Sequence, residues 1–309
     1  MFIAIDGGGT KTLSVAANAE GKILAVHKGP GTNVADIGLD ECRRRLHDQL
    51  SALLGDLSAP VDSVYAGIAG TANAINHDGV HRILCELLPN AKIIDNGSDA
   101  LSPLYGEAEE GIVMIAGTGS SAFAVSKRGI KQVGGWGYLI DDAGSGFAIG
   151  KAVLNAAFRD FDGRDRETEL TDMVRKKLNK PINEAIPDIY AGGKSFVASF
   201  APLAFKAMRC GDMTAFKITW SAAKDLAKLL KTCLKYVDAR PATAVITGGL
   251  TEDSIFVNMI ANEVGNKILL VKPDVPPVYG ALVKAVRNAG LSIGEGFKEN
   301  FRTSDSVCK

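Results

Sequence analysis

The sequence predicts an α/β fold made of two domains with related designs. Short apolar strands alternate with helical patterns along the chain, and this alternation favours sheets covered by helices. A strand, a glycine-rich turn and a second strand follow one another near Phe2 and again from Gly111, which is a weak internal duplication. A length of 309 residues is sufficient for two domains, and we expect a hinge between them near residue 115.

The first third of the chain predicts a strand meander followed by alternating helices and strands. Glycines and the Glu20-Gly21 pair provide the turns of the meander, and apolar residues at helical spacing mark the helices. Ser98 is a suitable N-cap for the last, short helix. The predicted elements are strands Phe2–Asp6, Ser14–Ala19 and Lys22–Lys28, helix Ile37–Leu54, strand Val61–Ala69, helix Asp78–Leu88, strand Lys92–Asp95 and helix Asp99–Tyr105.

From Gly111 the strand pattern begins again and then gives way to helices. The charged run Asp160–Glu169 is typical of a solvated loop that leads into a helix. The predicted elements are strands Ile112–Ala116 and Ala122–Ser126, a third strand ending at Gly134-Gly135, helices Gly146–Phe158, Arg166–Leu178, Lys194–Met208 and Thr214–Val237, strand Ala242–Thr247, helix Ser254–Gly265, strand Lys267–Val271 and helix Pro277–Ala289.

Composition and charge favour a cytoplasmic globular enzyme. Hydrophobic residues make up 46% and charged residues 23% of the chain, and 35 basic residues balance 35 acidic ones. Because there is no basic stripe, no apolar run of about 18 residues and no charged leader before an apolar core, we expect no nucleic acid, no membrane span and no secretory signal. The five cysteines form no Cys-x-x-Cys motif, so we expect them to be reduced and to hold no metal or cluster.

The turn after the first strand is the most informative motif. Three glycines follow Asp6 and precede Thr10 and Lys11. Glycine accepts positive φ angles and lets backbone N–H groups approach a ligand, so the turn suits the β- and γ-phosphates of a nucleotide. Asp6, at the strand tip, is suited to hydrated Mg²⁺. A tight hairpin turn without a ligand is the alternative interpretation.

Three further glycine motifs follow predicted strands. Gly117–Ser120 repeats the glycine and hydroxyl pattern of the first turn. Gly248 and Gly249 lie between a strand and a helix, where they leave room for a flat ring or a sugar. The segment Gly134–Gly137 places a tryptophan between glycines, which suits stacking on a sugar face, and Asp141 and Asp142 follow it. Each motif is also compatible with a plain turn.

Two familiar nucleotide signatures fail. Gly193-Lys194-Ser195 resembles the end of a Walker A loop, but Asp188 occupies the position of its first glycine. Gly117-x-Gly119-x-x-Ala122 matches a relaxed dinucleotide pattern, but that pattern must open a helix and the following residues predict a strand. A Rossmann oxidoreductase is therefore only a minor alternative.

Asp99 is the best candidate for a general base. It follows a strand and begins a helix, so its carboxylate is expected at the sheet edge where ligand crevices form, with Asp95 as a competitor. A helix-dipole role is the alternative for Asp99. Asn33 could bind sugar hydroxyls or simply form a turn. His77 and His81, four residues apart on a helix, are expected to be surface residues rather than a metal site.

In this order and spacing the motifs resemble the N-acetylglucosamine kinase and BadF/BadG/BcrA/BcrD ATPase branch of the actin-like ATPase superfamily, which includes sugar kinases, Hsp70 and actin. The likeness covers nearly the whole chain. The matching segments are Asp6–Lys11, Gly67–Gly70, Asp99, Ile115–Ser120, Gly134–Gly137, Asp142–Ser145 and Thr247–Leu250.

The resemblance implies two ribonuclease-H-like domains that flank a nucleotide cleft. The first would comprise residues 1–115, joined by the tail 291–309, and the second would comprise residues 116–290 with a helical insertion. The implied ATP contacts are Gly8, Gly9, Thr10, Lys11, Gly117, Thr118, Gly119, Gly248 and Gly249. Asp6 would organise Mg²⁺ through water. Asp99 would be the catalytic base, and the implied sugar contacts are Asn33, Asp99, Gly135, Trp136, Gly137 and Asp142.

The leading hypothesis is an ATP-dependent hexosamine kinase that phosphorylates the 6-hydroxyl of N-acetylglucosamine or a close relative. A glucosamine, N-acetylmuramate or broad-range hexose kinase is the alternative, and Asp95 or Asp142 could share the catalytic role. An ATP-driven activator without a sugar substrate is a further alternative. The cysteine-bound cluster of such activators is disfavoured because the segment Gly134–Gly146 contains no cysteine. Relatives are often dimers, so a homodimer is a possible assembly.

Overall fold

The computed structural model describes residues 1–55 and 57–303, and the chain divides into two compact units. Unit 1 contains the chain up to Glu109 together with the segment that begins at Pro273, and unit 2 runs from Glu110 to Lys272. Each unit is a mixed five-stranded sheet with helices, so the predicted α/β class is confirmed.

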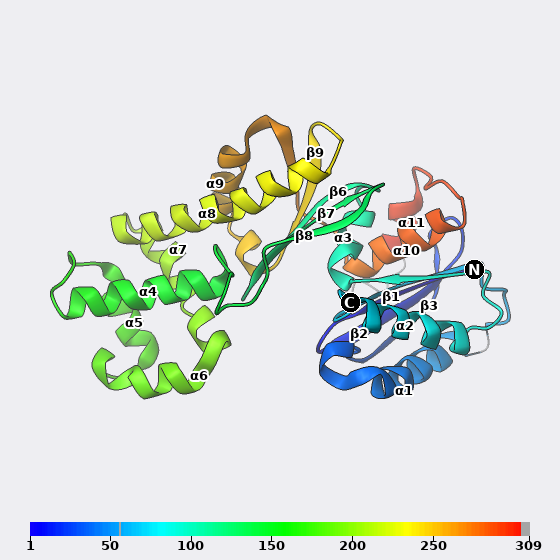
Figure 1. Ribbon diagram of the computed structural model, residues 1–309, viewed down its shortest axis with the longest axis horizontal. Coiled ribbons are helices and arrows are strands. Elements are labelled where there is room, and N and C mark those ends of the chain that lie inside the picture. Colours follow the sequence, from blue (N-terminus) through cyan, green and yellow to red (C-terminus); the bar gives the residue numbers. More distant parts are fainter. Residues whose placement is uncertain (56, 304–309) are drawn as a thin grey trace. The chain divides into compact units, whose positions relative to one another are not determined.

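Unit 1 is built on a sheet with strand order β3-β2-β1-β4-β5 (Figure 1). Its strands are β1 (Phe2–Gly7), β2 (Lys11–Ala17), β3 (Ile23–Pro30), β4 (Ser63–Ile68) and β5 (Ile93–Gly97). The first three form an antiparallel meander, and β4 and β5 run parallel to β1. The register pairs Asp6 with Gly67 and Gly67 with Gly97, so the ends of β1, β4 and β5 meet at one edge.

Helices cover both faces of this sheet. Ile3 and Ile5 of β1 pack into one core with helices α1 (Val34–Leu54) and α2 (Ala74–Leu87). Because side chains alternate along a strand, the other face of β1 is left for α10 (Pro277–Asn288), which packs on β1 and β4. The remaining helical elements are the 3₁₀ turn η1 (Asp99–Leu101), α3 (Ser102–Tyr105) and α11 (Phe297–Thr303).

Unit 2 repeats the same sheet design, with strand order β10-β9-β6-β7-β8. Its strands are β6 (Gly111–Ala116), β7 (Ser120–Ser126), β8 (Gly129–Val133), β9 (Ala242–Thr247) and β10 (Ile268–Val271). Strands β6, β7 and β8 form the antiparallel meander, and β9 and β10 run parallel to β6. The two sheets therefore share one topology, as the weak sequence duplication suggests.

A long helical segment connects β8 to β9 in unit 2. Its helices are α4 (Gly146–Phe161), α5 (Glu169–Leu178), α6 (Ile186–Ala198), α7 (Ala201–Arg209) and α8 (Met213–Cys233), with 3₁₀ turns η2 (Ile182–Ala185) and η3 (Leu234–Tyr236). After β9 come the turn η4 (Gly249–Glu252), helix α9 (Ser254–Val264) and the turn η5 (Gly265–Lys267). These helices bury apolar residues against the sheet in one continuous core.

Two expectations need adjustment. The predicted helix Lys194–Met208 is two helices, because α6 begins earlier and ends at Ala198 before α7 begins at Ala201. Helix α10 was expected in the second domain, but it packs on β1 and β4 and so lies in unit 1, which ends the second unit at Lys272 instead of residue 290. The first boundary lies at Glu109/Glu110, a few residues before the expected position.

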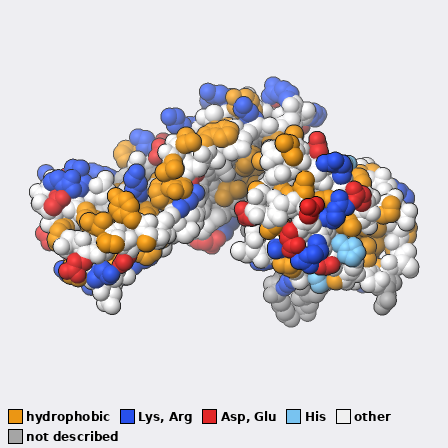
Figure 2. Space-filling model, turned by 60° about the horizontal axis from the view of Figure 1, so that its bottom comes forward, with side chains coloured by type: hydrophobic (Ala, Val, Ile, Leu, Met, Phe, Trp, Pro, Cys, Tyr) orange, Lys and Arg blue, Asp and Glu red, His pale blue; other side chains and the backbone are white. Residues whose placement is uncertain are grey.

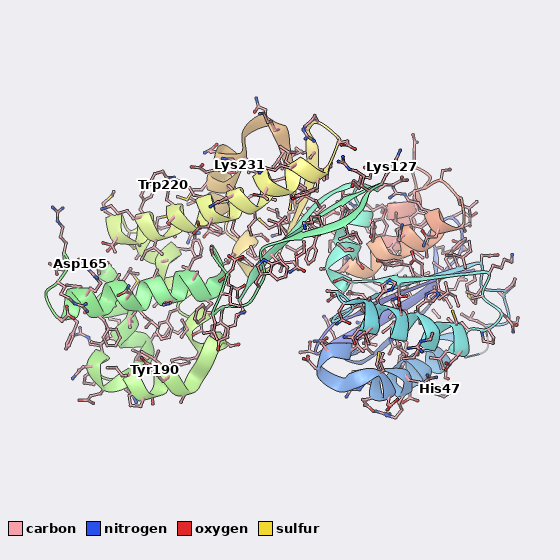
Figure 3. All side chains as sticks on the ribbon, viewed as in Figure 1. His47, Lys127, Asp165, Tyr190, Trp220 and Lys231 are labelled. Carbon is pink, nitrogen blue, oxygen red and sulfur yellow. The ribbon has the colours of Figure 1, made fainter. Side chains whose placement is uncertain are left out.

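The described surface carries both signs of charge. On the face shown in Figure 2, acidic and basic side chains lie next to one another. Figure 3 places several exposed side chains on the helices of unit 2, among them Trp220 and Lys231 on α8. Within residues 1–55 and 57–303, no helix is long and apolar enough to cross a bilayer. Four of the cysteines are free thiols, and Cys308 lies outside the described residues.

Candidate active site

The first glycine turn, Gly7–Lys11, connects β1 to β2. The Gly8 N–H donates to the Lys11 carbonyl at 3.0 Å and closes the turn. Behind the turn, a Cβ on Gly31 would lie 2.2 Å from the Gly9 carbonyl oxygen, so only glycine fits there. The N–H groups of Gly9 and Thr10 have no protein acceptor among the described residues. Two consecutive free N–H groups form a concave site that suits an anion such as phosphate.

Asp6 lies at the tip of β1, directly before this turn. Its pKa is raised to about 7, mainly by burial and also by the nearby Asp99 carboxylate, while Lys11 acts in the opposite direction. The Asp99 carboxylate lies close enough to act on Asp6, because the register places the ends of β1, β4 and β5 at one edge. Such a pair of oxygen donors suits a hydrated Mg²⁺, which keeps several waters and binds through one or two carboxylates plus phosphates.

Asp99 is placed by the turn η1 at the end of β5. Its Oδ1 accepts the Ala100 N–H at 2.9 Å and the Ser98 hydroxyl at 3.3 Å, whereas its Oδ2 has no protein partner among the described residues. Burial raises the pKa of Asp99. A Cβ on Gly67 would lie 3.2 Å from the Asp99 Cα and 2.4 Å from the Ser102 hydroxyl, so Gly67 allows η1 to approach β4.

Asp95, the competing candidate, is differently placed. Its Oδ2 accepts the amide of Asn288 at 2.8 Å, and its Oδ1 accepts the Asn96 N–H at 2.9 Å. Both carboxylate oxygens are therefore used within the protein. Asp99, in contrast, keeps one oxygen available for a ligand.

Asn33 and the two histidines have structural contacts. Asn33 is the N-cap of α1, because its Oδ1 accepts the Ala35 N–H at 3.2 Å and its amide donates to Asp36 at 2.6 Å. His77 and His81, which we expect to be surface residues rather than a metal site, are partly exposed, and their rings lie 3.1 and 3.2 Å from the carbonyl and the side-chain oxygen of Asn96. Among the described residues, no three His, Cys, Asp or Glu side chains form a metal-binding group.

The second glycine turn, Gly117–Ser120, connects β6 to β7 in unit 2. The Gly146 N–H donates to the Gly117 carbonyl at 2.7 Å, and the Phe147 N–H donates to the Thr118 carbonyl at 3.1 Å, so the start of α4 lies against the turn. The Thr118 and Gly119 N–H groups have no protein acceptor within the described residues. Since β7 follows the turn, the helix that a dinucleotide fingerprint requires is absent here.

Gly248 and Gly249 lie beside this second turn. Gly248 has a φ of 100°, and a Cβ there would lie 2.5 Å from the Ala116 carbonyl oxygen and 3.0 Å from the Gly117 nitrogen. A Cβ on Gly249 would meet no atom within 4 Å. Gly248 is therefore required by close packing of β9 against the turn, while Gly249 borders open space.

The loop after β8 carries the predicted sugar contacts. Gly134, Gly135 and Gly137 have φ angles of 70°, 78° and 95°, which only glycine adopts readily. Trp136 between them is 60% exposed, so it is not a core residue. The Asp142 side chain is only 5% exposed, and its oxygens meet the Lys194 ammonium at 2.7 Å and the Ser120 N–H at 3.4 Å.

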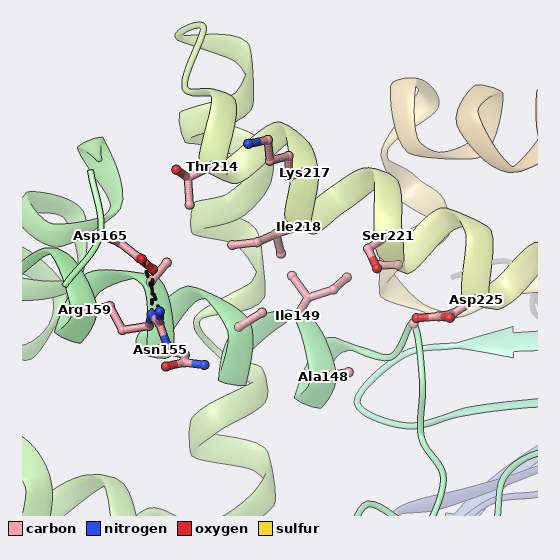
Figure 4. A pocket seen from close by; sticks show the side chains of 14 residues that line it. Ala148, Ile149, Asn155, Arg159, Asp165, Thr214, Lys217, Ile218, Ser221 and Asp225 are labelled. Atoms are coloured by element: carbon pink, nitrogen blue, oxygen red, sulfur yellow. Dashed lines mark hydrogen bonds and ion pairs between the residues drawn. The ribbon is translucent and has the colours of Figure 1, made fainter. Parts of the chain in front are cut away.

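A separate groove of about 410 Å³ lies between α4 and α8 of unit 2 (Figure 4). Ala148, Ile149 and Ile218 line it, the Arg159–Asp165 ion pair lies at one end, and Asp225 lies at the other. None of the predicted site residues lines this groove.

The structure brings the predicted residues into two groups, one in each unit. In unit 1, Asp6 and Asp99 share the sheet edge with the first glycine turn. In unit 2, Asp142 and Gly248 lie against the second glycine turn. Sequence reasoning missed the contact between Lys194 and Asp142, although the motif that contains Lys194 was visible. Its distance of 52 residues from Asp142 left no local signal.

Comparisons with known proteins agree with these motifs. The model of the BadF/BadG/BcrA/BcrD ATPase family matches residues 3–285. An N-acetylmuramic acid/N-acetylglucosamine kinase from Clostridium acetobutylicum is 31% identical over 306 residues, which cover 92% of this chain and 97% of that protein. A glucosamine kinase from Vibrio cholerae is 30% identical over 237 residues, which cover 74% of this chain and 79% of that protein.

The fold has a similar solved structure. A candidate N-acetylglucosamine kinase from Chromobacterium violaceum aligns with a TM-score of 0.68 and 22% identity, over 91% of this chain and 97% of that one. This likeness is one of fold, and it agrees with the predicted α/β fold.

Proposed function

We propose that this chain, which belongs to the BadF/BadG/BcrA/BcrD ATPase family, is an ATP-dependent hexosamine kinase. It transfers the γ-phosphate of ATP to the 6-hydroxyl of N-acetylglucosamine or a close relative. The names of the two curated relatives support an amino sugar as the small-molecule substrate. The cytoplasmic location and the homodimer stay predictions.

One observation carries the proposal. At a single sheet edge of unit 1, two half-buried carboxylates lie near one another beside a glycine turn whose N–H groups lack protein acceptors among the described residues. Phosphoryl transfer requires positioning, charge stabilisation and a base near the nucleophile, and this edge supplies a group for each task. A plain hairpin turn requires no buried pair of like charges, which is costly without a ligand.

The ATP contacts are assigned to both glycine turns and to the pair beside the second turn. Gly8, Gly9, Thr10 and Lys11 of unit 1, and Gly117, Thr118 and Gly119 of unit 2, would bind phosphates through the N–H groups that lack protein acceptors. Gly248 and Gly249 would border the adenosine, with the open space at Gly249 as the supporting feature.

Asp6 would hold Mg²⁺ through water. When bound, the ion neutralises charge on the β- and γ-phosphates. The residues fit this role, because Asp6 offers a carboxylate whose pKa is raised to about 7 in a site that has Lys11 as its nearby cation. A divalent cation there would restore the ionised form.

Asp99 would act as the general base. Its Oδ2, which lacks a protein partner among the described residues, accepts the proton of the sugar 6-hydroxyl. The hydroxyl oxygen bonds to the γ-phosphorus while the bond from that phosphorus to the bridging oxygen of ADP breaks. The raised pKa of Asp99 makes its carboxylate a better proton acceptor.

The sugar contacts are assigned to Asn33 and Asp99 in unit 1 and to Gly135, Trp136, Gly137 and Asp142 in unit 2. Trp136 offers an exposed aromatic face, and Asp142 offers a fixed carboxylate oxygen. Glucosamine and N-acetylmuramate remain alternative substrates, since the named relatives act on different amino sugars. A broad-range hexose kinase remains a further alternative.

The proposal is tested by coupled ADP release with ATP and Mg²⁺ and a panel of N-acetylglucosamine, glucosamine, N-acetylmuramate and glucose. We expect amino sugars to stimulate turnover many-fold above the sugar-free rate. An ATP-driven activator would instead hydrolyse ATP slowly at the same rate with every sugar. Stimulation by glucose equal to that by amino sugars would favour the broad-range kinase.

A further inference from the structure

Lys194 belongs to a motif that the proposed ATP and sugar contacts leave unused. We propose that Lys194 is a positioning residue, which holds the Asp142 carboxylate in place to accept a sugar hydroxyl. This inference rests on the proposed function, because it assumes that Asp142 contacts the sugar. The resemblance of Gly193-Lys194-Ser195 to a Walker A ending is then accidental, and the lysine serves the sugar site instead.

The ion pair between Lys194 and Asp142 is well shielded. The Lys194 ammonium lies 2.7 Å from Asp142 Oδ2, and the side chains are 31% and 5% exposed. Taking a carboxylate out of water is costly unless an opposite charge compensates for it. No other cationic side chain pairs with Asp142 among the described residues, so Lys194 alone provides this compensation.

The pair also leaves one oxygen of Asp142 available. Lys194 engages Oδ2, whereas Oδ1 has only the Ser120 N–H at the long distance of 3.4 Å. An ionised carboxylate oxygen accepts more than one hydrogen bond, so Oδ1 retains capacity for a hydroxyl. The neighbouring backbone is fixed as well, because the Ser120 hydroxyl donates to the Ala143 carbonyl at 2.8 Å.

A break in α6 directs Lys194 toward this site. Gly193 has a φ of 61° and interrupts the helical geometry, so Lys194 follows a different course from the first part of the helix, where Tyr190 is 84% exposed (Figure 3). After the break, the chain packs closely on α4, since a Cβ on Gly150 would lie 2.0 Å from the Val197 carbonyl oxygen. This contact fixes the segment that carries Lys194.

Aromatic side chains connect the pair to the predicted sugar loop. The Lys194 ammonium lies 5.6 Å from the ring centroid of Tyr138, which packs edge-on against Phe147 of α4 at 5.0 Å. Tyr138 is two residues from Trp136, the predicted stacking residue. A Cβ on Gly119 would lie 3.1 Å from both Lys194 Nζ and Asp142 Oδ2, so the pair rests directly against the second glycine turn.

Kinetic constants of three variants test the positioning role. We expect Lys194→Met to raise KM for the amino sugar about tenfold or more, with KM for ATP changed less than twofold. Lys194→Arg should recover most of the sugar affinity, because it keeps the positive charge. Lys206→Met, on the exposed surface of α7, is the matched control and should leave all constants unchanged. An unchanged sugar KM in Lys194→Met, or an equal rise in both KM values, overturns the inference.

A thermal-stability cycle provides a readout that needs no turnover. Lys194→Met should lower Tm by leaving a buried carboxylate without its partner, and adding Asp142→Asn to it should recover most of the loss. Additive losses in Tm would overturn the pairing. If the wild-type chain shows no sugar-dependent ADP release, the proposed function and its sugar assignment fail together. Sugar-dependent turnover with additive losses overturns only the role of Lys194.

Discussion

The two glycine turns share a backbone design and differ in the charges around them. Each turn connects the first two strands of its sheet and presents two N–H groups without protein acceptors among the described residues. Beside the first turn lie two carboxylates, Asp6 and Asp99. The positive charge of Lys11 compensates for them only in part. Beside the second turn, Asp142 is paired with Lys194.

This difference indicates separate tasks for the two turns. The half-buried carboxylates of Asp6 and Asp99 both have raised pKa values, so this pair suits a cation, a proton or both. A carboxylate that is paired with a lysine is held in one orientation, which suits hydrogen bonding to a neutral ligand. We therefore propose that both turns bind phosphate, that the carboxylates beside the first turn serve the chemistry, and that the carboxylate beside the second turn orients the sugar.

The largest expected effect comes from removing one carboxylate beside each turn. Asp99→Asn should lower kcat by about 10²–10⁴, the usual contribution of a general base. Asp142→Asn should mainly raise KM for the sugar, because its carboxylate binds and does not take the proton. Steady-state kinetics with saturating ATP separates the two effects. Asp95→Asn is the control, and a loss of kcat there as large as in Asp99→Asn would reassign the base.

Substituting one tightly packed glycine and one open glycine in each unit should distinguish glycines required for stability from glycines required for ATP binding. Gly31→Ala and Gly248→Ala place a Cβ 2.2 and 2.5 Å from backbone oxygens, so we expect losses of about 1–3 kcal/mol in stability. Gly9→Ala and Gly249→Ala meet open space and should change Tm little while raising KM for ATP. Thermal unfolding of the four variants checks this, and equal Tm values would contradict the packing argument.

The stability of the folded chain should depend on pH through Asp6. With its pKa raised to about 7 in the folded state, Asp6 keeps a proton that the unfolded chain has lost above its ordinary pKa near 3.8. Its contribution to stability is therefore present at low pH and is lost as pH rises from about 4 to 7.

The Asp6→Asn substitution should remove this loss of stability at rising pH, because asparagine does not titrate. We expect the variant to be more stable than the wild type above pH 7, by on the order of 1 kcal/mol, and to lose much of this advantage by pH 5. It should also be impaired in Mg²⁺-dependent turnover. Tm measured without Mg²⁺ between pH 5 and 8.5 tests the prediction. A stability difference that is independent of pH would show that Asp6 is ionised throughout.

A further moderate effect is expected at one of the two tryptophans of the chain. Trp136→Ala should raise KM for the sugar about tenfold, which corresponds to about 1.4 kcal/mol of lost contact. Trp220→Ala on α8 is the matched control and should leave KM unchanged. In a Trp220→Phe background, the fluorescence of Trp136 should change when sugar is added. An unchanged signal under saturating sugar would remove Trp136 from the site.

Local sequence patterns were sufficient for the fold class and for most of the elements. The strand, glycine turn and strand pattern depends on short-range sterics and apolar periodicity, so it is visible in one segment at a time. The same is true of the candidates Asp6 and Asp99, because a residue at the end of a strand, or just after it, must lie near the edge of the sheet where that strand ends. The order of the motifs was sufficient for the family.

Only the tertiary structure determined which charged side chains from distant segments interact. The pKa of Asp6 depends on Asp99, which the parallel register of β1, β4 and β5 places nearby although 93 positions separate them in sequence. The pairing of Lys194 with Asp142 depends on the break at Gly193 and on close packing against Gly150. Coulomb interactions and burial act through space, and no local pattern of residues records which distant charges the packing of a core brings together.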